Sequence, residues 1–124
     1  MMDLAELNRS VTIAILGAEA LPPGTWEAQR AFRQVADLEA EIATIIGART
    51  AAGEIARLGA VTAALSAGEP LRALQLGDRY LADGLSDGSK VRLELLLDEA
   101  EAEIERIAAA APNVDPIGFH LRAA

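Results

Sequence analysis

The five prolines of this 124-residue chain fall at only three places, which are Pro22-Pro23, Pro70, and the pair Pro112 and Pro116. Between these places the apolar residues recur at three- and four-residue steps, which is the period of an amphipathic helix. Proline disrupts a helix interior but is accepted in the first turn, so these positions mark helix boundaries. The pattern predicts an all-α fold, a bundle of four or five helices joined by short turns.

The first predicted helix covers the N-terminal segment and ends at Pro22-Pro23-Gly24. Asp3 is a suitable N-cap for it, because its side chain can accept from a free backbone N–H. A strand over residues 11–16 is the competing interpretation, since β-branched residues gather there. The helical spacing of the surrounding apolar residues favours the helix.

The stretch from residue 26 to 67 contains no proline and predicts either one long central helix or a helix pair. The row of apolar residues along one face of this stretch is interrupted at Arg49, where the helical spacing calls for another apolar residue. Gly47 and Gly53 flank this point, and Thr50 can cap a new helix. Both forms stay open, with a slight preference for a break near residues 47–50.

Two further helices are predicted, a short one over residues 70–83 and a C-terminal one over residues 88–111. Residues 1–111 are expected to form a single helical domain. Residues 112–124 carry two prolines and no helical period, so they predict a non-helical C-terminal tail.

The composition leaves few residue types for chemistry. The chain has no cysteine, one histidine and four aromatic residues, with a net charge of −8. We therefore expect no catalytic residues, no cofactor and no metal site, and the acidic charge argues against nucleic-acid or membrane partners. The N-terminus lacks the basic start and long apolar run of a signal peptide, and no run reaches the roughly 18 apolar residues of a membrane span. These observations predict a cytoplasmic protein.

One segment partly matches a calcium-binding loop. Asp83, Asp87, Gly88 and Glu94 occupy ligand and bend positions of an EF-hand pattern. Another ligand position holds a leucine, and a lysine stands where an aliphatic residue belongs. An ordinary turn before a capped helix is the preferred interpretation.

Two sets of residues are candidates for an interface. The first is the apolar seam of the central stretch, which comprises Val35, Leu38, Ile42 and Ile45. The second is a ridge of small residues four apart, which comprises Ala52, Ala56, Ala60 and Ala64. Small ridges let two helix axes approach closely, so the ridge fits a partner helix or a second copy. Packing within the chain is the alternative for the ridge.

The stretch from Ile55 to Leu85 resembles a tetratricopeptide helix pair. Gly68 would mark the turn, Ala73 the small packing position, and Tyr80 the end of the second helix. The resemblance covers about 30 residues, and one repeat cannot bury its own faces. The pattern prefers a bulky aromatic where this chain has glycine, and no proline closes the unit. We do not assign the family on this basis.

The sequence leads to three hypotheses for function. The first is a non-catalytic helical interaction or structural protein that self-associates as a homo-oligomer or docks helix to helix with a protein partner. An adaptor, an assembly subunit, a chaperone and a virion component all fit. The second is a monomeric tetratricopeptide-like module that binds a peptide or effector, and the third is an enzyme that relies on carboxylates. Ile117, Phe119 and Leu121 of the tail either fold back onto the bundle or dock into a partner.

Overall fold

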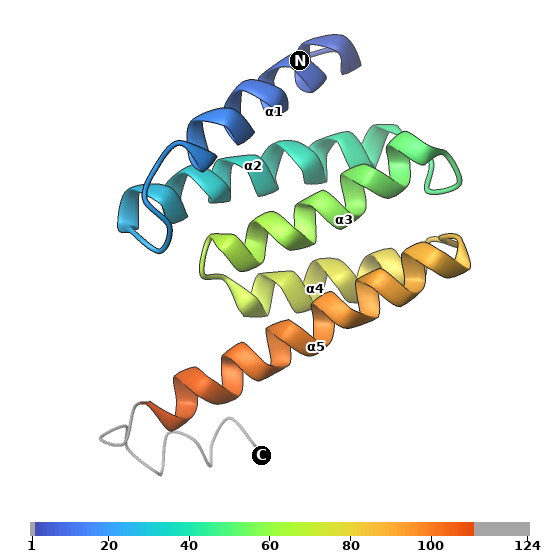
Figure 1. The fold of residues 1–124 in the computed structure, drawn as a ribbon. Helices are drawn as coiled ribbons and strands as arrows, with labels where there is room; N and C mark the ends of the chain where they lie inside the picture. The colour runs from blue at the N-terminus through green and yellow to red at the C-terminus, as the bar shows by residue number, and fades with distance from the viewer. Residues whose placement is uncertain (1, 111–124) are drawn as a thin grey trace.

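The computed structural model describes residues 2–110, which form five α-helices (Figure 1). The helices are α1 (Leu4–Glu19), α2 (Trp26–Ile45), α3 (Ala51–Ser66), α4 (Pro70–Leu81) and α5 (Asp87–Ala109). The all-α prediction is confirmed. The predicted tail contacts of Ile117, Phe119 and Leu121 lie outside the described residues.

Four of the five helices begin at a side chain that caps the first turn. Asp3, Thr25, Thr50 and Ser86 each accept a hydrogen bond from the backbone N–H three residues later. Helix α4 instead starts with Pro70 in its first turn, where the missing N–H costs nothing. The caps explain why a chain rich in alanine and leucine does not run on as fewer, longer helices.

The central stretch is a helix pair rather than one long helix. Helix α2 ends at Ile45 and α3 begins at Ala51, with Thr50 as the N-cap. Gly53 packs against the backbone carbonyl of Gly47, and a Cβ at this position would overlap that carbonyl group. The tight turn therefore needs a glycine at position 53. Gly53 and the N-cap Thr50, which the sequence offered as signs of a break, do mark a chain reversal.

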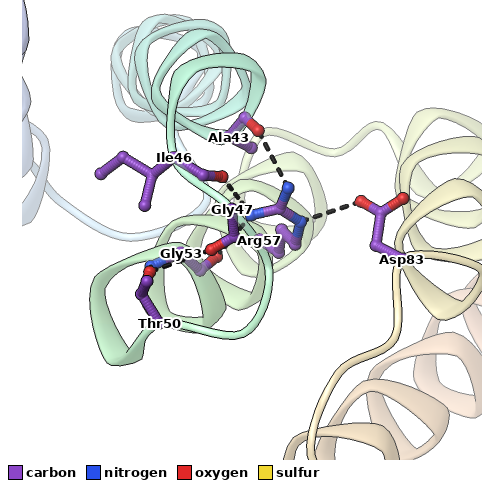
Figure 2. A network of polar contacts seen from close by, with 7 residues as sticks. All are labelled: Ala43, Ile46, Gly47, Thr50, Gly53, Arg57 and Asp83. Atoms are coloured by element: carbon purple, nitrogen blue, oxygen red, sulfur yellow. Dashed lines mark hydrogen bonds and ion pairs between the residues drawn. The ribbon is translucent and has the colours of Figure 1, made fainter.

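A buried arginine secures this turn (Figure 2). Arg57 is almost fully buried and donates to the carbonyl oxygens of Ala43, Ile46 and Gly53, each at 3.0 Å. Its Nε also donates to Asp83, in the turn after α4, at 2.9 Å. One side chain thus satisfies carbonyl groups at the end of α2 and ties α3 to the α4–α5 turn.

The helices pack in chain order, and Figure 1 shows them as a stack from α1 at the top to α5 at the bottom. Each helix contacts the next, and α3 also contacts α5. Helix α1 approaches α2 alone at close backbone distance, so α1 and α3 both pack on α2 without a close backbone approach to each other. The core is built mainly from small residues, and its largest fully buried side chains are Leu7, Val61 and Leu93. None of the described helices is long and apolar enough to cross a membrane.

Candidate docking groove

A groove opens between α1 and α3, with α2 as its floor. It encloses about 320 Å³. Most of the surface that lines it is apolar, contributed by aliphatic and aromatic side chains. Its lining includes Ile15 from α1, Phe32, Val35 and Glu39 from α2, and Ile55, Leu58 and Thr62 from α3. Because α1 and α3 do not approach each other closely along their backbones, the groove between them stays open to solvent, although Val35 and Glu39 on its floor are largely buried.

The groove adjoins two further hollows. Toward α5 it runs into a second hollow that shares Leu58, Thr62 and Arg92 with it and adds Leu95, Leu96 and Glu99. Toward the α1–α2 turn it runs into a third hollow, which shares Glu19, Phe32 and Ser66 with it. The result is one extended and mainly apolar surface of the kind that receives the face of a helix.

A carboxyl group lies on the floor of this groove. Glu39 is only 7% exposed and has no hydrogen-bond or ion-pair partner among residues 2–110. Its Oε2 sits against Gly59 of α3, where a Cβ would overlap it. Loss of surrounding water raises the pKa of Glu39 from 4.5 to about 7. An unpaired carboxyl in an apolar groove favours a ligand that brings a hydrogen-bond donor or a cation.

Two other charged groups line the groove, and neither pairs with Glu39. Glu19 contributes a second carboxylate from the end of α1. Arg92 reaches the groove from the α5 side. The charged groups on the α1 and α2 sides of the groove are therefore acidic, whereas its one base, Arg92, enters from the α5 side.

Two large aliphatic side chains beside the groove are strongly exposed. Ile55 on the α3 side is 66% exposed, and Leu95 on the α5 side is 63% exposed. Single exposed aliphatics are normal on a protein surface, but two beside an apolar groove enlarge its apolar area and make it a candidate docking surface.

The residues of the seam and of the ridge predicted from the sequence differ in how exposed they are. Val35 and Ile42 are buried, Leu38 is half-buried, and Ile45 is 51% exposed at the end of α2. In the ridge, Ala56, Ala60 and Ala64 are buried in the core of the single chain, and Ala52 is exposed. Of these eight residues only Val35 lines the groove.

Sequence reasoning missed the two residues that shape the groove floor, Glu39 and Gly59. A signal for Glu39 was present, because it lies four residues after Val35 and thus interrupts the apolar face of the helix with an acid. Gly59 gave no comparable signal, since its role depends on the carboxyl of a neighbouring helix.

The helix pair over residues 55–85 forms as expected. Gly68 has a positive φ of +73° in the turn, Ala73 is fully buried, and Tyr80 is buried near the end of α4. Gly77, where the tetratricopeptide pattern prefers an aromatic, packs closely against Leu97 of α5. A bulky side chain at this position would push α5 away. The glycine therefore allows the α3–α4 hairpin to pack closely against α5.

Side chains in the segment that partly matches a calcium loop form ion pairs and hydrogen bonds with other residues of the protein. Asp83 pairs with Arg57. Hydrogen bonds from Ser89 and Ser86 hold the pKa of Glu54 below its usual range, and these contacts join the starts of α3 and α5. Within residues 2–110 no group of three or more metal-ligating side chains comes together.

Comparison with known proteins identifies no relative, because no family model, no curated protein and no solved structure matches the chain.

Proposed function

We propose that this protein is a non-catalytic helical interaction protein that docks a helix of another polypeptide in the groove between α1 and α3. The observation that carries the proposal is the open apolar groove over α2, which surrounds the buried and unpaired carboxyl of Glu39. The fitting partner is an amphipathic helix whose apolar face carries one basic residue. An assembly subunit or an adaptor would work in this way.

The energetics of the groove support docking. Full burial of an exposed leucine or isoleucine stabilises a complex by about 1.5–3 kcal/mol. Covering Ile55 and Leu95 and pairing the Glu39 carboxyl therefore contribute several kcal/mol. Association itself costs at least about 4 kcal/mol, so the partner must cover much of the groove to bind stably.

The arrangement around Glu39 fits recognition better than catalysis. General acid–base or nucleophilic chemistry needs a second group within hydrogen-bond reach of the first. Glu39 has no such partner among residues 2–110. A lone carboxyl in an apolar groove instead supplies specificity, because it penalises any partner that leaves it unpaired.

A photo-crosslinking amino acid placed at Thr62 tests the proposal. Thr62 is exposed, lines the groove, and donates its hydroxyl to a backbone carbonyl of its own helix. Thr44 is the matched control, since it is an exposed threonine with the same kind of bond that lines none of the hollows described above.

In the native cells, the residue at position 62 is expected to form adducts with a defined helical segment of a protein, identified by mass spectrometry. The residue at position 44 is expected to form few. Equal labelling from both positions, or none from position 62, would contradict the proposal.

A further inference from the structure

Helix α1 carries a second apolar stripe that no other part of the described chain covers. Ile13 is 70% exposed and Leu16 is 65% exposed, and Arg9 lies one turn before Ile13. Arg9 and Ile13 also line a shallow, mainly apolar hollow on the helix surface. The spacing of four and then three residues places all three side chains along one side of the helix.

This stripe faces away from α2. The buried residues of α1 are Leu7, Val11 and Ala18, which pack toward α2. Around the helix axis, residues 9, 13 and 16 lie roughly opposite the buried residues 7, 11 and 18. Helix α1 is therefore apolar on two sides, although the single chain covers only one of them.

We propose that the groove is occupied by this α1 stripe of a second copy of the chain, with Arg9 of one copy facing Glu39 of the other. The inference rests on the proposed docking function and names its partner. Shape and charge both match, because two exposed aliphatic side chains enter an apolar groove and one base meets an unpaired carboxyl. Burial of this pair strengthens its attraction relative to water.

The two surfaces lie side by side on the same helix, which makes the contact self-complementary. Helix α1 forms one wall of the groove through Ile15 and also carries the stripe. When α1 of one copy enters the groove of another, its own groove is brought next to the α1 stripe of that copy. A two-fold dimer then covers both stripes and pairs both carboxyl groups.

The charges around the groove agree with this orientation. Glu19 and Glu39 line the groove from α1 and α2, Arg92 lines it from α5, and α3 contributes no charged side chain to the lining. Arg9 would therefore meet two acids at the α1 side of the groove, whereas Arg92 lines it from the α5 side. The reverse placement would bring Arg9 toward Arg92, a repulsion that Glu99 in the adjoining hollow offsets only in part.

The test is the absolute mass in solution over a dilution series at about pH 8, with a double-mutant cycle. The variants are Arg9→Gln, Glu39→Gln and the double variant, with Arg30→Gln as the control. Arg30 is an exposed arginine of α2 whose ring contact is with Trp26. Circular dichroism on each sample verifies the fold, which we expect to persist because Arg9 is exposed and glutamine matches glutamate in size.

The wild type is expected to be a dimer that dissociates on dilution. Each single variant is expected to raise the dimer dissociation constant on the order of tenfold or more, since one side chain of each buried pair is lost. The double variant is expected to raise it little beyond the worse single variant, because the two side chains act as a pair. Arg30→Gln is expected to change it less than about twofold.

A wild type that stays monomeric at the highest concentration would overturn the inference, as would independent effects of Arg9 and Glu39. If position 62 still cross-links a different polypeptide in that case, the docking function stands and only the choice of partner fails. If position 62 does not cross-link either, both fail.

Discussion

Replacing Glu39 by glutamine is expected to stabilise the fold by an amount that depends on pH. The Glu39 carboxyl is buried, and the loss of water around it raises its pKa from 4.5 to about 7. Glutamine has nearly the same size but does not ionise. The variant therefore keeps the packing against Gly59 and removes the cost of a buried charge.

The sign follows from the protons that each state binds. Between pH 4.5 and about 7 the folded chain keeps the proton on Glu39, whereas the unfolded chain has released it. The free energy of unfolding therefore falls as the pH rises through this window. Each pKa unit is worth about 1.4 kcal/mol, so the loss approaches about 3 kcal/mol at a pH well above 7.

Urea unfolding followed by circular dichroism at pH values between about 5 and 8.5, on protein dilute enough that the chain is monomeric, measures this difference. Subtracting wild type from Glu39→Gln cancels the other titrating groups. The difference is expected to stay below about 1 kcal/mol at the lowest pH and to reach about 3 kcal/mol at the highest. Glu41→Gln, at an exposed position of the same helix, is the control and is expected to stay within about 0.5 kcal/mol throughout. A Glu39→Gln effect that does not change with pH would refute the reasoning.

Three further substitutions test the turn and the groove by urea unfolding or NMR, with Gly17→Ala as a control. Gly53→Ala is expected to destabilise by about 2 kcal/mol or more because its Cβ overlaps a backbone carbonyl, whereas Gly17→Ala has open space and is expected to stabilise by up to about 1 kcal/mol. Arg57→Met leaves buried carbonyl groups unpaired and is expected to cost about 3 kcal/mol, so a loss below about 1 kcal/mol would contradict the network. Gly59→Ala is expected to push the facing carboxyl outward, so its pKa, followed by carbon-13 NMR, falls toward its usual value, and an unchanged pKa would contradict the contact.

The helices of this fold are largely readable from local signals. Proline positions and the caps Asp3 and Thr25 bound the elements, and the structure begins helices at those places. The break in the central stretch was the harder case, because a faltering seam fits either a shifted stripe or a turn. Thr50 and Gly53 decide it through contacts within a few residues, which sequence reasoning can weigh.

The groove could not be predicted from local sequence signals, because it depends on how α1 and α3 pack relative to each other on α2. Nothing local to α1 or α3 indicates that both pack on α2 without a close backbone approach to each other. The alanine ridge shows the same limit, since Ala56, Ala60 and Ala64 look alike whether they face a neighbour in the chain or a second molecule. The structure places them in the chain's own core.

The central claim is that the groove between α1 and α3 is a docking surface, and the absence of cysteine from the chain allows a direct test. A spin label is attached at Thr62→Cys or at Thr44→Cys, and its mobility is measured by electron paramagnetic resonance. The measurement is made over a dilution series of the pure protein and in extract of the native cells. The label at position 62 is expected to lose mobility as the groove fills, while the label at position 44 stays mobile. A label at position 62 that remains as mobile as the control under both conditions would contradict the claim.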